Sequence, residues 1–377
     1  MKRILHITGG MQRAGAETLL MNLYRNLDKE NYQFDFIYFT NVKCDYDDEI
    51  ENLGGVIYRI ISKKSSNKLV RVLKRYIDYN RLLKNLSDHQ IVHSHINLNG
   101  ALFLLIAKWN KKSIRISHSH ISSGKKTIFS RLYRFTCRKI IKKSSNVYMA
   151  CGEAAGKYLY PSIPEKNVIV FPNSIEIENF QKKEKFNQFL RDELEIDEDV
   201  KIITQIGRFT YQKNFEFTID LIEHLTRTDK KLHFVFLGTG PYEERLKIAA
   251  KEKKIEKYIT FYGISSEIPK ILHSSDLFIM PSRLEGFPVV LVEAQACGIP
   301  CLISDNISKE VDMGLNLISF LSLSDTLNIW SRGLYASLKK KSNDFEKIKR
   351  IMKSKNFDAS DSSKKLQEIY NEVYANK

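Results

Sequence analysis

Residues 281–300 carry the clearest structural pattern in the sequence and read Pro-Ser-Arg-Leu-Glu-Gly-Phe-Pro-Val-Val-Leu-Val-Glu-Ala-Gln-Ala-Cys-Gly-Ile-Pro. The apolar run 276–280 before it is short and rich in β-favouring residues, so it predicts a buried parallel strand. Pro288 suits a first helical position, because its missing N–H is no loss there. Gly298 and Pro300 then end the helix. A strand, a turn and a helix start are therefore expected at the carboxyl edge of a sheet, where open α/β sheets bind ligands.

Two carboxylates flank this predicted turn. Glu285 lies in the turn, and Glu293 lies on the helix, roughly 8 Å further along its axis. The N–H groups of Val289, Val290 and Leu291 have no partner within a new helix, so they would face an anion such as a phosphate. Such a site suits a ligand with hydroxyls on both sides of its phosphates. A nucleotide sugar is such a ligand.

The seven-residue gap between the two glutamates resembles the E-x7-E signature of retaining glycosyltransferase family 4, whose members have the GT-B fold. The resemblance implies that Glu285 contacts the transferred sugar and that Glu293 binds the nucleotide ribose. The alternative is an ordinary βα turn with two exposed glutamates. The other donor-binding residues expected in this stretch are Gly286, Phe287, Val289 and Val290.

Residues 207–214, Gly-Arg-Phe-Thr-Tyr-Gln-Lys-Asn, resemble the G-R-x4-K-N motif of the same family. The resemblance implies that Arg208 and Lys213 hold the donor diphosphate, which gains negative charge as it leaves. A surface Arg and Lys without a ligand is the alternative. Because these cations and the helix start would supply the electrostatic stabilisation, we expect no metal cofactor. Gly263 ends a further predicted strand, 258–263, in the loop where the family holds the nucleobase.

The first half of the chain has a glycine-rich loop, 9–18, before an apolar run at helical spacing. Its residues 14–17, Ala-Gly-Ala-Glu, resemble the family's commoner GGAE, with Ala14 as the departure. The resemblance implies that Gly15 approaches the donor diphosphate or the acceptor. Residues 45–47, Asp-Tyr-Asp, are formally a DxD metal motif, but they lie in a polar loop, so we expect a solvated loop or helix cap there.

Two histidine pairs, 93/95 and 118/120, follow predicted strands. The resemblance implies that one histidine lies beside the donor sugar, and His120 aligns best with it, with His118 as the second choice. The alternative is that these histidines only cap the ends of their strands. We expect the two rings of each pair to point to opposite faces of their strand. Without a Cys or third-ligand pattern, we therefore predict no zinc site.

Composition limits the class of protein. The 377 residues suit two domains, with 43% hydrophobic and 28% charged residues, as in soluble proteins. No apolar run reaches the roughly 18 residues of a membrane span. The five cysteines show no framework spacing, which favours free thiols in a reducing cytoplasm.

The formal charge of +16 is uneven. Residues 1–180 hold 29 Lys+Arg against 15 Asp+Glu, and residues 181–377 hold 31 against 29. Nucleic acid and an acidic membrane face would both suit the basic half. Residues 125–143 predict an amphipathic helix whose apolar stripe either packs on its own sheet or rests, with its basic face, on anionic lipid.

The expected architecture is α/β with the GT-B fold: two Rossmann-like, doubly wound parallel-sheet domains facing across a cleft. The expected boundaries are 1–180 for the acceptor domain, 181–357 for the donor domain and 358–377 for a helix that returns to the first domain. By the resemblance, the enzyme moves a hexose with retention from a nucleotide sugar, probably UDP-linked, to a saccharide or lipid-linked acceptor in capsule or exopolysaccharide synthesis. It would act in the cytoplasm, peripherally on the inner membrane face, without nucleic acid as a partner. The alternatives are a nucleotide-sugar epimerase of the same plan and a non-catalytic basic protein.

Overall fold

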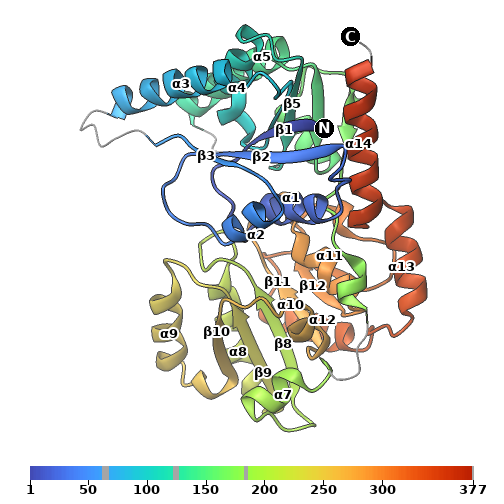
Figure 1. Cartoon of the computed structure of the whole chain (residues 1–377). Helices are drawn as coiled ribbons and strands as arrows, with labels where there is room; N and C mark the ends of the chain where they lie inside the picture. Colours follow the sequence, from blue (N-terminus) through green and yellow to red (C-terminus); the bar gives the residue numbers. More distant parts are fainter. Residues whose placement is uncertain (62–67, 122–126, 182–185, 376–377) are drawn as a thin grey trace. The chain divides into compact units, whose positions relative to one another are not determined.

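The structure is a computed structural model that describes residues 1–61, 68–121, 127–181 and 186–375, and it divides into two compact units (Figure 1). Unit 1 comprises residues 1–174 and 358–377, and unit 2 comprises residues 175–357. Among the residues that the structure describes, no helix is both long and apolar enough to cross a membrane.

Unit 1 is built on a seven-stranded sheet in the order β3-β2-β1-β4-β5-β6-β7, and each neighbouring pair is parallel. Parallel neighbours need crossover connections, which the intervening helices supply. The strands are β1 (Lys2–Ile7), β2 (Tyr32–Tyr38), β3 (Ile57–Arg59), β4 (Ile91–Ser94), β5 (Ile114–Ser119), β6 (Val147–Ala150) and β7 (Val168–Val170). The helices are α1 (Gly15–Arg25), α2 (Asp47–Asn52), α3 (Lys68–Asn85), α4 (Ala101–Trp109), α5 (Ile128–Ser144), α6 (Glu153–Leu159) and α14 (Ala359–Ala375).

The last helix, α14, packs on unit 1 beside α1 (Figure 1). Leu366, Ile369 and Tyr370 join the apolar core formed by β1, β2 and α1. The Ser363 hydroxyl donates a 3.1 Å hydrogen bond to the Leu23 carbonyl of α1. The C-terminal residues therefore complete the core of the unit that the N-terminal residues begin.

Unit 2 repeats the plan with six strands in the order β10-β9-β8-β11-β12-β13, again with parallel neighbours. The strands are β8 (Lys201–Ile206), β9 (Leu232–Leu237), β10 (Ile259–Gly263), β11 (Leu277–Met280), β12 (Cys301–Ser304) and β13 (Ile318–Leu321). The helices are α7 (Phe189–Leu194), α8 (Phe215–Thr226), α9 (Glu243–Glu252), α10 (Ile268–His273), α11 (Val289–Ala296), α12 (Leu327–Leu338) and α13 (Phe345–Ser354). The prediction of two parallel-sheet α/β domains is confirmed.

The stretch 281–300 forms the predicted strand–turn–helix, with one change at the helix start. Pro288 is the N-cap, with extended backbone, and α11 begins at Val289. At the other end Gly298 has φ +71°, and a Cβ there would collide with the Ser342 carbonyl oxygen. Glycine is therefore required where this helix stops.

Candidate active site

The candidate site in unit 2 lies where two neighbouring strands end. β8 and β11 are parallel and adjacent, so their following loops, 207–214 and 281–288, leave the same edge of the sheet. Arg283 N–H donates to the Gln212 carbonyl at 2.8 Å, and the Gln212 amide donates to the Leu284 carbonyl at 2.8 Å. The Asn214 amide donates to the Pro281 carbonyl at 2.9 Å. These hydrogen bonds hold together two motifs that lie about 70 residues apart in the sequence.

Lys213 and Glu285 meet in this loop pair. The Lys213 Nζ lies 2.7 Å from Glu285 Oε1, with the side chains 20% and 8% exposed. The Gln205 amide donates a 3.0 Å hydrogen bond to the Lys213 carbonyl and so fixes the backbone of the lysine. A Cβ at Gly207 would lie only 3.1 Å from the Lys213 stem, so a glycine at this position leaves room for the lysine side chain. The result is a largely buried cation–carboxylate pair.

Arg208, the other predicted cation, is exposed at the start of the same loop. Among the described residues its guanidinium forms no ion pair, whereas Lys213 is paired with Glu285. The two cations predicted to hold a diphosphate therefore differ: one is open to solvent and the other is already neutralised by a carboxylate.

The start of α11 stands beside this pair in the sequence and in the fold. Gly286 and Val290 are partly exposed, Val289 is buried, and the Phe287 ring stacks on Phe357 with centroids 5.7 Å apart. The expectation that Leu291 N–H faces an anion is wrong, because this group donates to the Pro288 carbonyl at 3.1 Å.

Glu293 and Gly263 occupy two further places in unit 2. Glu293 is partly exposed on α11, and burial of its carboxyl group raises the pKa to about 7. Gly263 ends β10 with φ +79°, and its carbonyl accepts a 2.7 Å hydrogen bond from Gly238 N–H. A positive φ favours glycine there, so the backbone at this strand end has an unusual course.

Gly15 and His120 belong to unit 1. Gly15 is the first residue of α1, after an extended Ala14. His120 follows β5 and is partly exposed; its backbone N–H donates to Asn97 Oδ1 at 2.8 Å. Burial lowers the pKa of His120 to about 4, so its imidazole is neutral at physiological pH. Asn97 thus fixes the backbone of the histidine that the sequence singles out.

The expectation that each histidine pair diverges is wrong. The rings of His93 and His95 have centroids 4.2 Å apart, as do the rings of His118 and His120. Residues two apart in a strand point to the same face, because side chains alternate. His6 of β1 joins the group, with Nδ1 3.0 Å from His95 Nε2. Sequence reasoning missed His6, because no local pattern shows that β1 lies beside β4 in the sheet.

The DxD residues are engaged by the protein. Asp45 Oδ2 accepts a 2.9 Å hydrogen bond from Arg13 N–H, and Asp47 pairs with Arg59. Asp47 Oδ2 also accepts a 2.8 Å hydrogen bond from Cys44 N–H beside the start of α2. Asp45 is exposed in the loop, as expected, but Asp47 is buried and does not cap the helix, because it is the first residue of α2 and is paired with Arg59.

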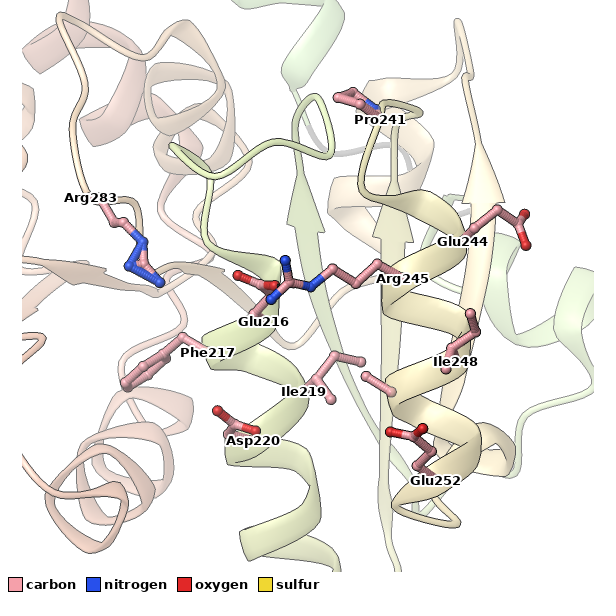
Figure 2. A pocket seen from close by; sticks show the side chains of 11 residues that line it. Glu216, Phe217, Ile219, Asp220, Pro241, Glu244, Arg245, Ile248, Glu252 and Arg283 are labelled. Carbon is pink, nitrogen blue, oxygen red and sulfur yellow. Dashed lines mark ion pairs between the residues drawn. The ribbon is translucent and has the colours of Figure 1, made fainter.

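A separate hollow of about 820 Å³ lies over α8 and α9 (Figure 2). In it the Arg245 guanidinium reaches from α9 to Glu216 of α8, with Nε and Oε1 2.7 Å apart. None of the residues predicted to bind the donor lines this hollow. The candidate site is therefore defined by its loops and not by this cavity.

A comparison with solved structures defines the class of fold. The structure of Anabaena HepE in complex with UDP and glucose matches with a TM-score of 0.81 at 14% identity, covering 99% of this chain and all of that one. The two parallel-sheet units thus have the predicted GT-B fold.

Sequence comparisons give the family. The description "Glycosyltransferase Family 4" matches residues 13–179, and "Glycosyl transferases group 1" matches residues 186–313. Putative glycosyltransferase EpsF of Bacillus subtilis (strain 168) is 34% identical over 375 residues, which cover 98% of this chain and 96% of that protein. The chain therefore belongs to the glycosyltransferases, with a family 4 domain followed by a group 1 domain, and the predicted enzyme class is confirmed.

Two further relatives carry more specific names. The capsular polysaccharide biosynthesis glycosyltransferase CapH of Staphylococcus aureus is 28% identical and covers 83% of this chain and 84% of its own length. The UDP-Gal:α-D-GlcNAc-diphosphoundecaprenol α-1,3-galactosyltransferase of Escherichia coli is 24% identical over 76% of this chain and 79% of its own.

Proposed function

We propose that this enzyme transfers a hexose from a UDP-sugar, with retention of anomeric configuration, to a lipid-linked or saccharide acceptor in cell-surface polysaccharide synthesis. The observation that carries the proposal is the Lys213–Glu285 pair at the strand edge that also holds Arg208 and the start of α11. The name of CapH supports a role in cell-surface polysaccharide synthesis, and the name of the E. coli galactosyltransferase supports a lipid-linked acceptor.

In the proposed reaction the bond between the anomeric carbon and the diphosphate oxygen breaks. The acceptor oxygen bonds to the same face of that carbon, and its proton passes to the departing diphosphate. Arg208 and Lys213 stabilise the charge that develops on the diphosphate, as fixed cations do in a site sheltered from water. Glu285 orients the sugar hydroxyls and shares Lys213 with the diphosphate. No protein nucleophile takes part, and we expect no metal at the diphosphate.

Glu293 is proposed to accept hydrogen bonds from the ribose, and Gly263 to approach the base through its backbone. The partners of Gly286, Phe287, Val289 and Val290 are the phosphates and the nucleoside. In unit 1 we assign His120 to the donor sugar and Gly15 to the diphosphate or acceptor.

The direct test is an assay with several UDP-hexoses and an undecaprenyl-diphosphate-linked sugar, with product anomers read by NMR. Transfer with retention supports the proposal. Conversion of the donor into another UDP-hexose without any acceptor would instead establish the epimerase alternative, and an inverted product would refute the retaining mechanism.

The surface of α3, α4 and α5 supports a membrane-bound acceptor. Ile128 and Phe129 of α5 are 81% and 87% exposed, so this half of the stripe does not pack on its own sheet. Residues 125 and 126, at the start of the predicted helix, lie outside the described residues. Further exposed apolar residues are Val70, Val72, Leu73, Ile77, Trp109, Leu132, Tyr133 and Phe135. Exposed basic residues on α3 and α5 are Arg71, Lys74, Arg81, Lys84, Arg131, Lys139, Lys142 and Lys143.

Apolar side chains among cations match an anionic lipid surface, and we propose that this α3–α5 surface rests on the cytoplasmic membrane face. In a flotation assay the wild-type protein should rise with anionic vesicles, whereas the double variant Phe129→Ser/Leu132→Ser should stay in the dense fraction. Ile248→Ser, an exposed apolar residue of unit 2, is the matched control and should stay bound. Retention unchanged in about 0.5 M salt and on neutral lipid would argue against the electrostatic part.

A further inference from the structure

Five histidines of unit 1 gather on one face of the sheet. His6 lies on β1, His93 and His95 lie on and just after β4, and His118 and His120 lie on and just after β5. β1, β4 and β5 are neighbours, and His6 stands opposite His93 in the register. Rings on adjacent strands therefore come close, with His93 and His118 centroids 5.4 Å apart.

Hydrogen bonds account for only part of the polar groups in this histidine cluster. His6 Nδ1 lies 3.0 Å from His95 Nε2, and His95 Nδ1 lies 3.0 Å from His120 Nε2. His118 is 1% exposed, and among the described residues neither of its ring nitrogens has a hydrogen-bond partner. Within the same part of the chain, His6 Nε2, His93 Nε2 and His120 Nδ1 are also buried without one. Buried polar groups without partners are costly and call for an explanation.

The cluster meets the requirements of metal ligands. Ligand nitrogens of His95, His118 and His120 all lie within 4.8 Å of one another. Two imidazole nitrogens on one tetrahedral Zn²⁺ are about 3.3 Å apart, given Zn–N bonds of about 2.0–2.1 Å. The observed His95–His120 separation of 3.0 Å is close to that spacing. Burial and the neighbouring imidazoles hold the pKa of His118 well below its ordinary value, so its lone pair is available at neutral pH.

We propose that His95, His118 and His120 form a binding site for one borderline transition-metal ion, best matched by Zn²⁺. Three imidazoles suit zinc, copper or nickel, whereas magnesium and calcium prefer oxygen ligands. The partly exposed His120 gives the ion a route from solvent, which the fully buried alternative set of His6, His93 and His95 lacks. The contact of His95 Nε2 with His6 Nδ1 is the outer-shell hydrogen bond that orients such a ligand.

This inference goes beyond the proposed transfer reaction and departs from the sequence-based expectation of no metal. The site lies in unit 1, whereas the residues assigned to the diphosphate's charge lie in unit 2. The metal would tie together the ends of β4 and β5, so its first consequence is on stability, although His120 is also the residue assigned to the donor sugar.

The test uses the untagged full chain after treatment with a chelator. Titration with Co²⁺, a coloured substitute for Zn²⁺, should give visible bands that saturate at about one ion per chain, and Zn²⁺ should displace them. Zn²⁺ should also raise the melting temperature, since it binds the folded state. Mg²⁺ should do neither.

His118→Gln should abolish the Co²⁺ bands and the Zn²⁺-dependent rise in melting temperature. His233→Gln is the matched control, because His233 is a partly buried histidine of unit 2 that contacts Thr260 at 2.8 Å. The proposal is overturned if wild-type protein gives no saturable Co²⁺ bands, or if the bands survive His118→Gln. Bands that survive His118→Gln but vanish in His93→Gln would assign the ion to the other histidine set. A metal-free His118→Gln protein with a normal circular dichroism spectrum shows that the loss is not unfolding.

Discussion

Replacing the two members of the Lys213–Glu285 pair separately and together should reveal what each contributes. At 2.7 Å, and with an effective dielectric constant of about 20, the gross attraction is about 6 kcal/mol. Desolvation of two largely buried ions cancels most of this, so a net coupling of about 1–3 kcal/mol is expected.

The single variants should differ in stability. Lys213→Met removes the cation paired with Glu285, which is only 8% exposed, and breaking a buried ion pair by removing one partner costs about 3–5 kcal/mol. Glu285→Gln leaves a lysine that is 20% exposed and can turn towards water, so its cost should be smaller, about 1–2 kcal/mol. Lys213→Met/Glu285→Gln should be more stable than Lys213→Met alone. Urea unfolding of the four proteins gives the coupling energy.

The same four proteins separate the two functional roles. Lys213→Met should weaken UDP binding tenfold or more, since a hydrogen bond to a charged group is worth about 1.5–3 kcal/mol. Glu285→Gln should bind UDP at least as well as wild type, because Lys213 no longer has to break its ion pair with Glu285 in order to bind the diphosphate. Both should turn over at least tenfold more slowly, which is about 1.4 kcal/mol of barrier. Calorimetry with UDP and a transfer assay measure these effects. Equal UDP affinity in wild type and Lys213→Met, or wild-type turnover in both variants, would refute the assignment.

Three further predictions concern stability. The carboxyl group of Glu293 has a pKa of about 7 in the folded state, above its ordinary 4.5, so the folded state binds this proton more tightly than the unfolded state. The free energy of unfolding should therefore fall as the pH rises from 4.5 to 7. The fall should be at most about 3 kcal/mol, and smaller because Glu293 is partly exposed. Glu293→Gln should flatten that part of the urea-derived pH profile, and an identical slope in both proteins would contradict it. Gly298→Ala should destabilise by several kcal/mol, since it adds a collision with the Ser342 carbonyl to an unfavourable φ of +71°. Gly314→Ala is the control, because Gly314 has φ +73° and a Cβ there would meet nothing closer than Lys355 Nζ at 3.8 Å. This control should lose only about 1–2 kcal/mol of stability. Equal losses of stability in the two variants, measured by thermal melts, would exclude the collision. Asp35→Asn should lower the free energy of unfolding in urea by about 3–5 kcal/mol, because the buried carboxylate of Asp35 is bonded to Arg3 and His89. Burial raises the pKa of Asp35, but hydrogen bonds from His89 and Arg3 outweigh it and hold the pKa below its ordinary value, so the stabilisation should be lost as the pH falls through that pKa. The same loss of stability at acidic pH in Asp35→Asn and in the wild type would contradict this assignment.

The amino-acid sequence was sufficient for the repeating strand–helix plan and for the loop motifs. The short apolar run, the proline near the helix start and the glycine at its end predict a buried strand, a turn and a helix in residues 276–300. The structure has this strand and helix as β11 and α11. The spacing of Glu285 and Glu293 and the motif 207–214 pointed to the family that the sequence comparisons then established.

Other features depend on contacts between distant segments, which no local pattern encodes. That Lys213 pairs with Glu285 follows from the adjacency of β8 and β11, strands separated by two other strands in the sequence. That Leu291 N–H is satisfied by Pro288 depends on the backbone turn at the N-cap.

By itself, then, the sequence determined the class of fold, the motifs and their chemistry, because these depend on residue type and short-range spacing. The tertiary structure alone decided which charges neutralise each other and that five histidines from three strands share one face. Ion pairs and hydrogen bonds form only between groups about 3–4 Å apart, and only the folded sheet brings residues from separate strands within that distance.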